Sequence, residues 1–239
     1  MLTYGETTLQ MLGDTDYGAV RRIPAFAGVS EPAMRELLVG ASVVPCANAA
    51  ILFHQGDYPD FLYILLDGRV SLIGIGGGEQ TVVEVVPTLE TFVLASALTA
   101  QPYLVTARAI GHSRLMRLPA ADLRRQIQDE PSLAGGLLQL LARHDRRMVR
   151  QNKDLKLRSA TQRLGCHLLA LAAEQKSGPK VVLSYEKRTL AAKLGMTPEN
   201  LSRAFASLRR YKVAVSGQHV MLGDIPGLRD YCRPDDPEE

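Results

Sequence analysis

Residues 187–208, KRTLAAKLGMTPENLSRAFASL, decide the fold of the C-terminal part of this chain. Apolar residues recur at helical spacing on both sides of a glycine, at Leu190, Leu194, Leu201, Phe205 and Leu208. Gly195 suits the left-handed backbone of a turn, and Thr197 followed by Pro198 is typical of the N-cap and first position of a second helix. The stretch therefore predicts two short helices that cross at a tight turn, which is a helix-turn-helix.

Polar side chains near the start of the second helix indicate contact with DNA. Arginine can bond guanine through two N–H groups, glutamate can accept from cytosine N4, and serine can bond either kind of base. Other basic residues suit phosphates, which fix register rather than sequence. We assign base reading to Glu199, Ser202 and Arg203, and other DNA contacts to Thr197, Asn200, Lys187, Arg188, Arg209, Arg210 and Lys212. Residues 213–215 and 219–222, on either side of Ser216-Gly217, predict a hairpin that forms a wing.

Charge is divided unevenly along the chain. The net charge of +3 combines an acidic part, residues 1–142 with 9 Lys or Arg against 14 Asp or Glu, and a basic block, residues 180–222 with 8 against 2. Residues 143–158 are also basic, and the tail from 224 is acidic. This pattern is typical of a nucleic-acid-binding segment joined to another domain. A solvated helix surface is the alternative that charge alone leaves open.

The N-terminal half has the pattern of a small β-structure. After a helical lead-in over about 21–39, short runs of strand-forming residues alternate with turn residues, at 50–54, 62–66, 70–75, 81–86, 103–109 and 114–118. Asp67-Gly68 and the triplet Gly76–Gly78 favour tight hairpins between them. We expect a β-roll or small barrel.

From Pro131 the pattern changes to that of one long helix. Apolar or seam residues recur at alternating spacings of three and four, at Ala134, Leu137, Leu141, His144, Met148, Gln151 and Leu155. Such a seam, with a basic exposed face, predicts pairing with a second copy of the chain; a helix that packs only on its own domain is the alternative. A further helix at 161–176 and a short strand at 181–183 lead into the helix-turn-helix.

Length and composition agree with an α+β chain of three parts. The 239 residues predict an effector-sensing domain at 1–130, a dimerisation helix and hinge at 131–158, and a DNA-binding domain at 159–239. No apolar run approaches the roughly 18 residues that a membrane span needs. The N-terminus lacks a signal peptide, and three scattered cysteines indicate a reducing compartment, so we expect a cytoplasmic protein. We find no zinc-ligand spacing, phosphate loop or nucleophile elbow, and predict neither a metal site nor an enzyme.

The order of these parts resembles the Crp/Fnr superfamily of bacterial transcription regulators. The resemblance covers about residues 20–225 and rests on 53–57 (FHQGD), 62–70 (LYILLDGRV) and 190–203. Glu199-x-x-Ser202-Arg203 is similar to the pattern of the Fnr and nitric-oxide-responsive Dnr branches, which implies a TTGAT-type half-site read by a homodimer. The resemblance also implies contact with RNA polymerase, for which we favour the hairpin at 74–80.

The sensor domain departs from the cyclic-nucleotide-binding members of that superfamily. Those members have a Gly-Glu pair that holds the ribose and, about ten residues later, an Arg that neutralises the phosphate. Here Leu94 and Ala95 stand at the first two positions, and Val105 and Thr106 at the later ones. Because a buried phosphate without a counter-charge is costly, we expect no productive binding of cAMP or cGMP. Arg108 does not substitute, since strand alternation places it opposite Val105.

Other sensor chemistries differ in what they require. An iron–sulfur cluster needs about four thiolates, which Cys46, Cys166 and Cys232 do not supply. Haem that senses nitric oxide or carbon monoxide stays open, with His54, His112, His144 and Met148 as candidate axial ligands. Cys166 lies near the hinge and either reports oxidation or is a small buried apolar residue. The other hypothesis is an interaction module that binds a small molecule such as a cyclic nucleotide and docks a protein through its C-terminal domain without binding DNA. Steep salt dependence of binding would distinguish a DNA-binding protein from it.

Overall fold

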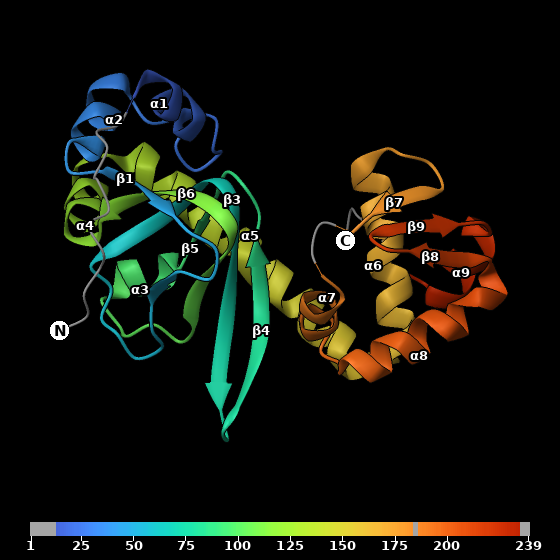
Figure 1. Cartoon of the computed structure of the whole chain (residues 1–239). Helices are drawn as coiled ribbons and strands as arrows, with labels where there is room; N and C mark the ends of the chain where they lie inside the picture. Colours follow the sequence, from blue (N-terminus) through green and yellow to red (C-terminus); the bar gives the residue numbers. More distant parts are fainter. Residues whose placement is uncertain (1–12, 184–185, 235–239) are drawn as a thin grey trace. The chain divides into compact units, whose positions relative to one another are not determined.

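The computed structural model describes residues 13–183 and 186–234. Its internal contacts divide the chain into two units, Met1–Arg146 and Arg147–Glu239. Each unit has its own antiparallel sheet, and helix α5 (Pro131–Leu157) runs across the division (Figure 1). The mixed helix and sheet architecture confirms the predicted α+β class, with a β-domain first, a long helix next and a winged helix-turn-helix last.

Two long strands organise the sheet of the first unit. The strands are β1 (Ser42–Cys46), β2 (Ile51–Phe53), β3 (Phe61–Gly76), β4 (Glu79–Val86), β5 (Glu90–Phe92) and β6 (Thr106–Pro119). The order is β1-β6-β3-β4, with β2 also paired to β6 and β5 to β3. Because β3 and β6 each pair with strands at both of their ends, they connect the two halves of a rolled sheet. Figure 1 shows β3 and β4 extending as a long hairpin.

The predicted hairpin at Asp67-Gly68 is wrong. Strand β3 runs through this dipeptide, and its register against β6 shifts on both sides of Asp67, which marks a bulge. Gly68 has φ +86°, and a Cβ there would lie 2.6 Å from the carbonyl oxygen of His112, so the bulge requires glycine. The other glycine turn is confirmed, since Gly77 and Gly78 have positive φ and close the β3–β4 hairpin.

The other strand and helix boundaries of the first unit also differ in part from the prediction. Strand β6 is continuous where two strands were expected, and it begins after Val105. The helices are α1 (Asp14–Arg21), α2 (Glu31–Leu38), α3 (Leu94–Thr99) and α4 (Ala120–Asp129). Of these, α2 corresponds to the predicted lead-in; the Ser30 hydroxyl caps it by accepting from the Ala33 N–H at 3.4 Å. The others were not expected, because their apolar residues pack against partners distant in the sequence.

Alternate residues of β3 face two separate apolar cores. Leu62 and Ile64 pack with the helices, whereas Tyr63 and Leu65 face an interior that also holds Phe53 and Tyr103. The first half of α5 belongs to the helical core, where Leu133, Leu137 and Leu140 are buried. Gly136 lets this helix lie directly on the turn at Ala25, since a Cβ would overlap the Ala25 carbonyl.

Burial of one face of α5 corrects part of the predicted dimer seam. Leu137 is only 2% exposed and belongs to the intramolecular core, whereas Leu141 is only partly buried against it, so burial removes Leu137 from the predicted seam. His144 lies 3.0 Å from the Glu90 carboxylate of β5 through its Nε2. Large apolar side chains that remain exposed on this helix are Leu138, Met148, Val149, Leu155 and Leu157.

The second unit is a winged helix-turn-helix. Its elements are α6 (Ala160–Gln175), β7 (Lys180–Val182), α7 (Lys187–Lys193), α8 (Pro198–Leu208), the 3-10 turn η1 (Arg209–Tyr211), β8 (Val213–Ser216), β9 (His219–Leu222) and α9 (Ile225–Cys232). A capping box of Ser159 and Gln162 begins α6. The strands order as β7-β9-β8, and Gly217 at φ +59° closes the wing. Within the described residues, no helix combines the length and apolar character of a membrane span.

Candidate nucleic-acid interface

The turn between α7 and α8 is held from both sides. Gly195 has φ +62°, and a Cβ there would collide with the Leu155 side chain, so glycine is required. The Thr197 hydroxyl accepts from the Asn200 N–H at 3.2 Å and caps α8. Arg163 of α6 donates from Nε to the Leu194 carbonyl at 2.8 Å and from Nη2 to the Gly195 carbonyl at 3.1 Å. Arg163 thus ties the turn to α6, and nothing in the spacing along the helix-turn-helix predicts this contact.

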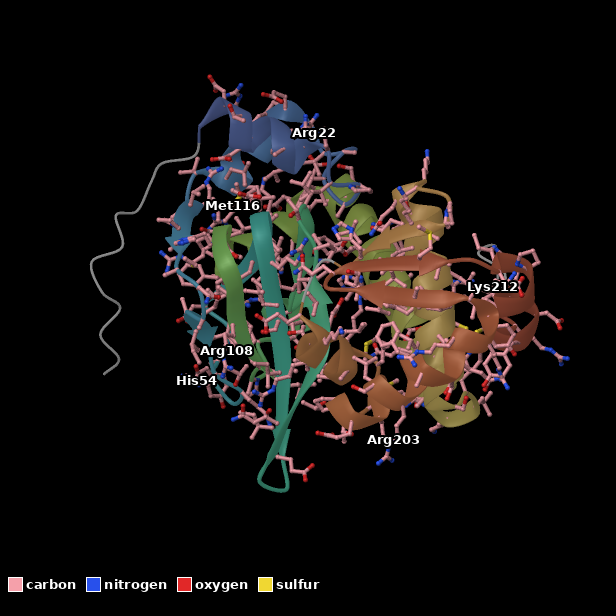
Figure 2. The ribbon with its side chains drawn as sticks, turned by 45° about the vertical axis from the view of Figure 1, so that its right-hand side comes forward. Arg22, His54, Arg108, Met116, Arg203 and Lys212 are labelled. Atoms are coloured by element: carbon pink, nitrogen blue, oxygen red, sulfur yellow. The ribbon has the colours of Figure 1, made fainter. Side chains whose placement is uncertain are left out.

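The three residues assigned to base reading all lie exposed on the first two turns of α8. Their helix packs through Leu201, Ala204 and Leu208, which are buried. Figure 2 shows Arg203 pointing away from the ribbon into solvent. The Ser202 hydroxyl donates to the Pro198 carbonyl at 3.0 Å, so its oxygen is left to accept from an amino group of a base. The same face thus presents a donor fork and an acceptor.

Glu199 is the acidic member of this set. Its own backbone N–H and the Thr197 hydroxyl, together with the Arg203 charge, hold the pKa of the Glu199 carboxyl below its ordinary value. The carboxylate is therefore ionised at neutral pH and acts as an acceptor. Such a group suits the amino group of cytosine and repels phosphate.

The remaining basic residues surround this helix in the second unit. Lys187 and Arg188 are exposed at the start of α7, and Arg209 and Lys212 are exposed beyond the end of α8. Arg210 differs, because its guanidinium lies 4.9 Å from the Tyr211 ring centre and 4.6 Å from that of Tyr231. This stacking holds Arg210 against α9, so packing is part of its role.

The four positions expected to form an effector pocket lie in the first unit, and all but Thr106 are apolar. Leu94 is buried in the helical core, Ala95 is exposed, and Val105 packs on the interior core. The buried Thr106 hydroxyl accepts from the Gln55 N–H at 3.0 Å. Val105 lies just before β6, so the predicted alternation between Val105 and Arg108 along one strand does not apply. Within β6, Arg108 follows Ala107, which faces the interior core, and Arg108 is only half-buried.

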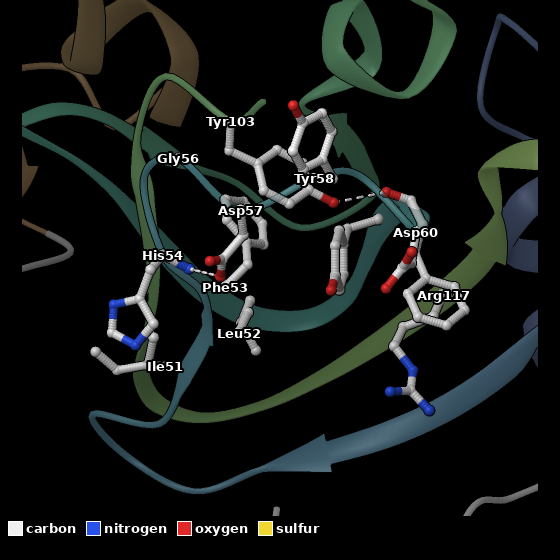
Figure 3. A pocket seen from close by; sticks show the side chains of 12 residues that line it. Ile51, Leu52, Phe53, His54, Gly56, Asp57, Tyr58, Asp60, Tyr103 and Arg117 are labelled. Carbon is white, nitrogen blue, oxygen red and sulfur yellow. Dashed lines mark hydrogen bonds between the residues drawn. The ribbon is translucent and has the colours of Figure 1, made fainter. Parts of the chain in front are cut away.

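A cavity of about 630 Å³ opens in the sensor domain near β2. Its lining residues include the aromatic side chains of Phe53, Tyr63 and Tyr103. Figure 3 shows His54 and Arg117 on opposite sides of it. The Arg117 guanidinium lies 4.9 Å from the Phe61 ring centre, and its Nε is buried with no hydrogen-bond partner among the described residues. Of the four candidate haem ligands, His54 is the one among the residues that line this cavity.

Comparison with known proteins matches each of the two units to a domain family. The family model of the cyclic nucleotide-binding domain matches residues 44–130, and that of the Crp-like helix-turn-helix domain matches residues 162–231. The Cyclic AMP receptor protein of Thermus thermophilus is 31% identical over 159 residues, which cover 66% of this chain and 72% of the relative. The chain belongs to the Crp/Fnr superfamily of transcription regulators.

Two further relatives of the superfamily agree over nearly the whole chain. The CRP-like cAMP-activated global transcriptional regulator of Mycobacterium tuberculosis is 26% identical over 89% of this chain and 97% of its own length. A solved structure, a putative cAMP-binding regulatory protein from Silicibacter pomeroyi, is 29% identical, covers 92% of this chain and 99% of its own, and has a TM-score of 0.60. The predicted membership and DNA-binding helix-turn-helix are confirmed, and the family consists of regulators rather than enzymes.

Val93 directly precedes Leu94 and has φ +55°, a conformation that favours glycine and strains a β-branched residue. Leu94 itself is buried.

Proposed function

We propose that the chain is a homodimeric transcription regulator that reads a palindrome of TTGAT-like half-sites. The observation that supports this most is the exposed face of α8, where Arg203, Ser202 and the ionised Glu199 stand together on a helix whose angle is fixed by its turn. An arginine fork selects guanine, and a carboxylate selects cytosine. Flanking Lys187, Arg188, Arg209 and Lys212 supply phosphate contacts.

The exposed face of α5 supplies the dimer surface in this proposal. Leu138, Met148 and Val149 are exposed, and helical spacing puts them on one face with Leu141 at its border. This revised seam keeps Met148 from the original one; Leu155 lies beside it and also contacts the turn at Gly195. Two-fold pairing would place two recognition helices about 34 Å apart, one turn of DNA.

The sensor domain in this proposal does not use a cyclic nucleotide. The phosphate of such a ligand needs a cation, and Val105, which packs on the apolar interior core with Leu72 and Val86, stands where the cyclic-nucleotide-binding members have arginine. Burying that charge unpaired would cost several kcal/mol. In this proposal, the dependence on cAMP that the names of some relatives state is therefore not carried over to this chain.

Haem is the second candidate for the sensor. The cavity near β2 combines an imidazole, His54, with a guanidinium, Arg117, and these are the group types that an iron ligand and a propionate partner require. His112 is exposed on the sheet, His144 pairs with Glu90, and Met148 lies on the dimer face. An absorption spectrum of protein expressed with haem supply tests this: a Soret band that is lost in His54→Ala supports it, and no band refutes it.

Two further assignments complete the proposal. We place the RNA polymerase contact on the tip of the β3–β4 hairpin, residues 74–80, where Ile75 is exposed. We also place the protein in the cytoplasm, since it acts on DNA.

Binding to labelled duplexes tests the main proposal. A duplex with two inverted half-sites about 10 bp apart between centres should bind at least about 1,000-fold more tightly than a scrambled duplex, and a single half-site should bind more weakly than the pair. Affinity should fall steeply between 50 and 200 mM salt, on the scale set by several phosphate contacts. Equal, salt-insensitive affinity for all three duplexes would favour a protein-docking module instead. A micromolar dissociation constant for cAMP in isothermal titration calorimetry would overturn the proposal that the sensor domain does not use a cyclic nucleotide.

A further inference from the structure

The fold brings two cysteines of the second unit together. Cys166 lies on α6 and Cys232 ends α9, 66 residues apart in the chain. The Cys166 thiol donates to the Cys232 carbonyl oxygen at 3.6 Å, and the Cys232 thiol lies within hydrogen-bond reach of the Cys166 sulfur. Gly165 makes room for this pair, because a Cβ there would collide with the Cys232 sulfur. We infer that Cys166 and Cys232 form a modification site at which a hydroperoxide produces an intramolecular disulfide.

A guanidinium lies against one of the two sulfurs. Arg158 directly follows α5, and its side chain is only 12% exposed. Its Nη1 lies 3.1 Å from the Cys166 Sγ and also donates to the backbone carbonyls of Cys232 and Arg233. Its Nε pairs with the Asp154 carboxylate, which holds the group in place. A fixed cation at this distance favours the thiolate, so Cys166 is the sulfur that ionises first.

The other sulfur has the opposite character. The hydrogen bond to Cys166, followed by burial, holds the pKa of the Cys232 thiol well above its ordinary value. Cys232 therefore keeps its proton, and Cys166 is the sulfur of the pair that the Arg158 charge favours as a thiolate. Cys232 is also almost fully buried, whereas Cys166 is half-buried. A small oxidant from solvent meets the more accessible and more nucleophilic sulfur first.

The chemistry takes two displacements with hydrogen peroxide as the oxidant. The Cys166 thiolate attacks one oxygen, so that an S–O bond forms, the O–O bond breaks and hydroxide leaves. The Cys232 sulfur then attacks the sulfenic sulfur of Cys166, the S–S bond forms, the S–O bond breaks, and the thiol proton leaves with the oxygen as water. The pair loses two electrons and two protons, and the peroxide becomes two water molecules.

Peptide mapping of the full-length protein tests the site. Reduced protein freed of reductant is treated with a few equivalents of hydrogen peroxide, alkylated and digested. We expect one linked peptide pair that contains Cys166 and Cys232, within a monomer whose mass is lower by two hydrogens. Cys46 should stay alkylated, because burial raises the pKa of its thiol and it lies in the other unit. Three alkylated thiols after treatment, or a disulfide that joins two chains, would overturn the inference.

Variants separate the roles of the groups. Cys232→Ser should stop the reaction at a Cys166 sulfenic acid that dimedone traps, and the matched Cys46→Ser should form the disulfide at the wild-type rate. Arg158→Gln should slow the oxidation of Cys166 about tenfold at neutral pH and move its rate profile to higher pH. Dimedone labelling of Cys46 instead of Cys166 would refute the site. An unshifted rate profile in Arg158→Gln would refute the role of Arg158.

Discussion

Replacing Arg203 by alanine should remove base discrimination without disturbing the fold. The side chain is exposed and points away from the helix core, and the backbone around it is held by Leu201 and Ala204. A bidentate contact to guanine contributes about 1–3 kcal/mol of discrimination. The loss corresponds to about 5- to 150-fold in affinity for each half-site. The unfolding free energy of the variant should stay within about 0.5 kcal/mol of the wild type.

The decisive assay is a cycle of two proteins and two duplexes. Anisotropy titrations compare wild type and Arg203→Ala on the palindrome and on a duplex in which the guanine of each half-site is replaced. Wild type should lose affinity on the altered duplex, and the variant should bind both duplexes equally. Arg209→Ala is the matched control, because loss of a phosphate contact weakens binding to both duplexes alike and lowers the salt slope by about one for each subunit of the dimer. If Arg203→Ala still prefers the palindrome as strongly as wild type does, the assignment of Arg203 is refuted.

Three further predictions concern stability and assembly. In urea titrations, Gly68→Ala should lower the unfolding free energy by about 3 kcal/mol or more, because φ is +86° and the new Cβ would meet a carbonyl oxygen. The control Gly77→Ala lies in open space at φ +59° and should lower it by about 1 kcal/mol. Equal losses in the two variants would contradict the bulge. Leu137→Ala should lower the unfolding free energy by about 2–5 kcal/mol, because Leu137 is buried. Leu138, which is 68% exposed, should affect assembly instead, so Leu138→Ala should weaken dimerisation in sedimentation experiments. The reverse pattern would support the originally predicted seam. Burial holds the pKa of His167 at about 3, so below pH 6.5 the unfolded chain binds a proton that the folded chain does not bind. The unfolding free energy should therefore fall as pH drops from 6.5 towards 3, by up to about 1.4 kcal/mol per pH unit. An equally steep fall in His167→Gln would refute this cause.

The helix-turn-helix could be predicted because its determinants are local. The turn glycine Gly195, the cap Thr197 and the apolar spacing all fall within 187–208, and each choice agrees with the others. What the sequence did not reveal was support from other segments. Arg163 reaches the turn from α6, and Arg210 stacks on Tyr231 of α9. Such contacts depend on packing between elements, which spacing along one helix does not report.

The sensor domain was harder to predict because its deciding contacts are long-range. Asp67-Gly68 has the composition of a hairpin, yet the backbone of β6 passes so close to Gly68 that the same residues form a bulge in a continuous strand. In α5, spacings of three and four fit more than one face of a helix. Only the position of the intramolecular core decides that Leu137 faces inward and Leu138 outward. The heptad pattern predicted the helix correctly but not which of its faces is free.

In the sensor domain, the residues that the fold requires differ from those that a ligand site requires. The rolled sheet depends on apolar packing, and Leu94 satisfies that requirement fully, being buried in the helical core. Binding a cyclic nucleotide depends instead on two charged groups at defined positions, and packing does not select for them. Val93 keeps the left-handed backbone of a glycine turn without being glycine, at a cost of about 1–3 kcal/mol that the surrounding structure must offset. The turn conformation is thus held by the sheet and helix around it, so a match to the domain family carries information about the fold and little about the ligand.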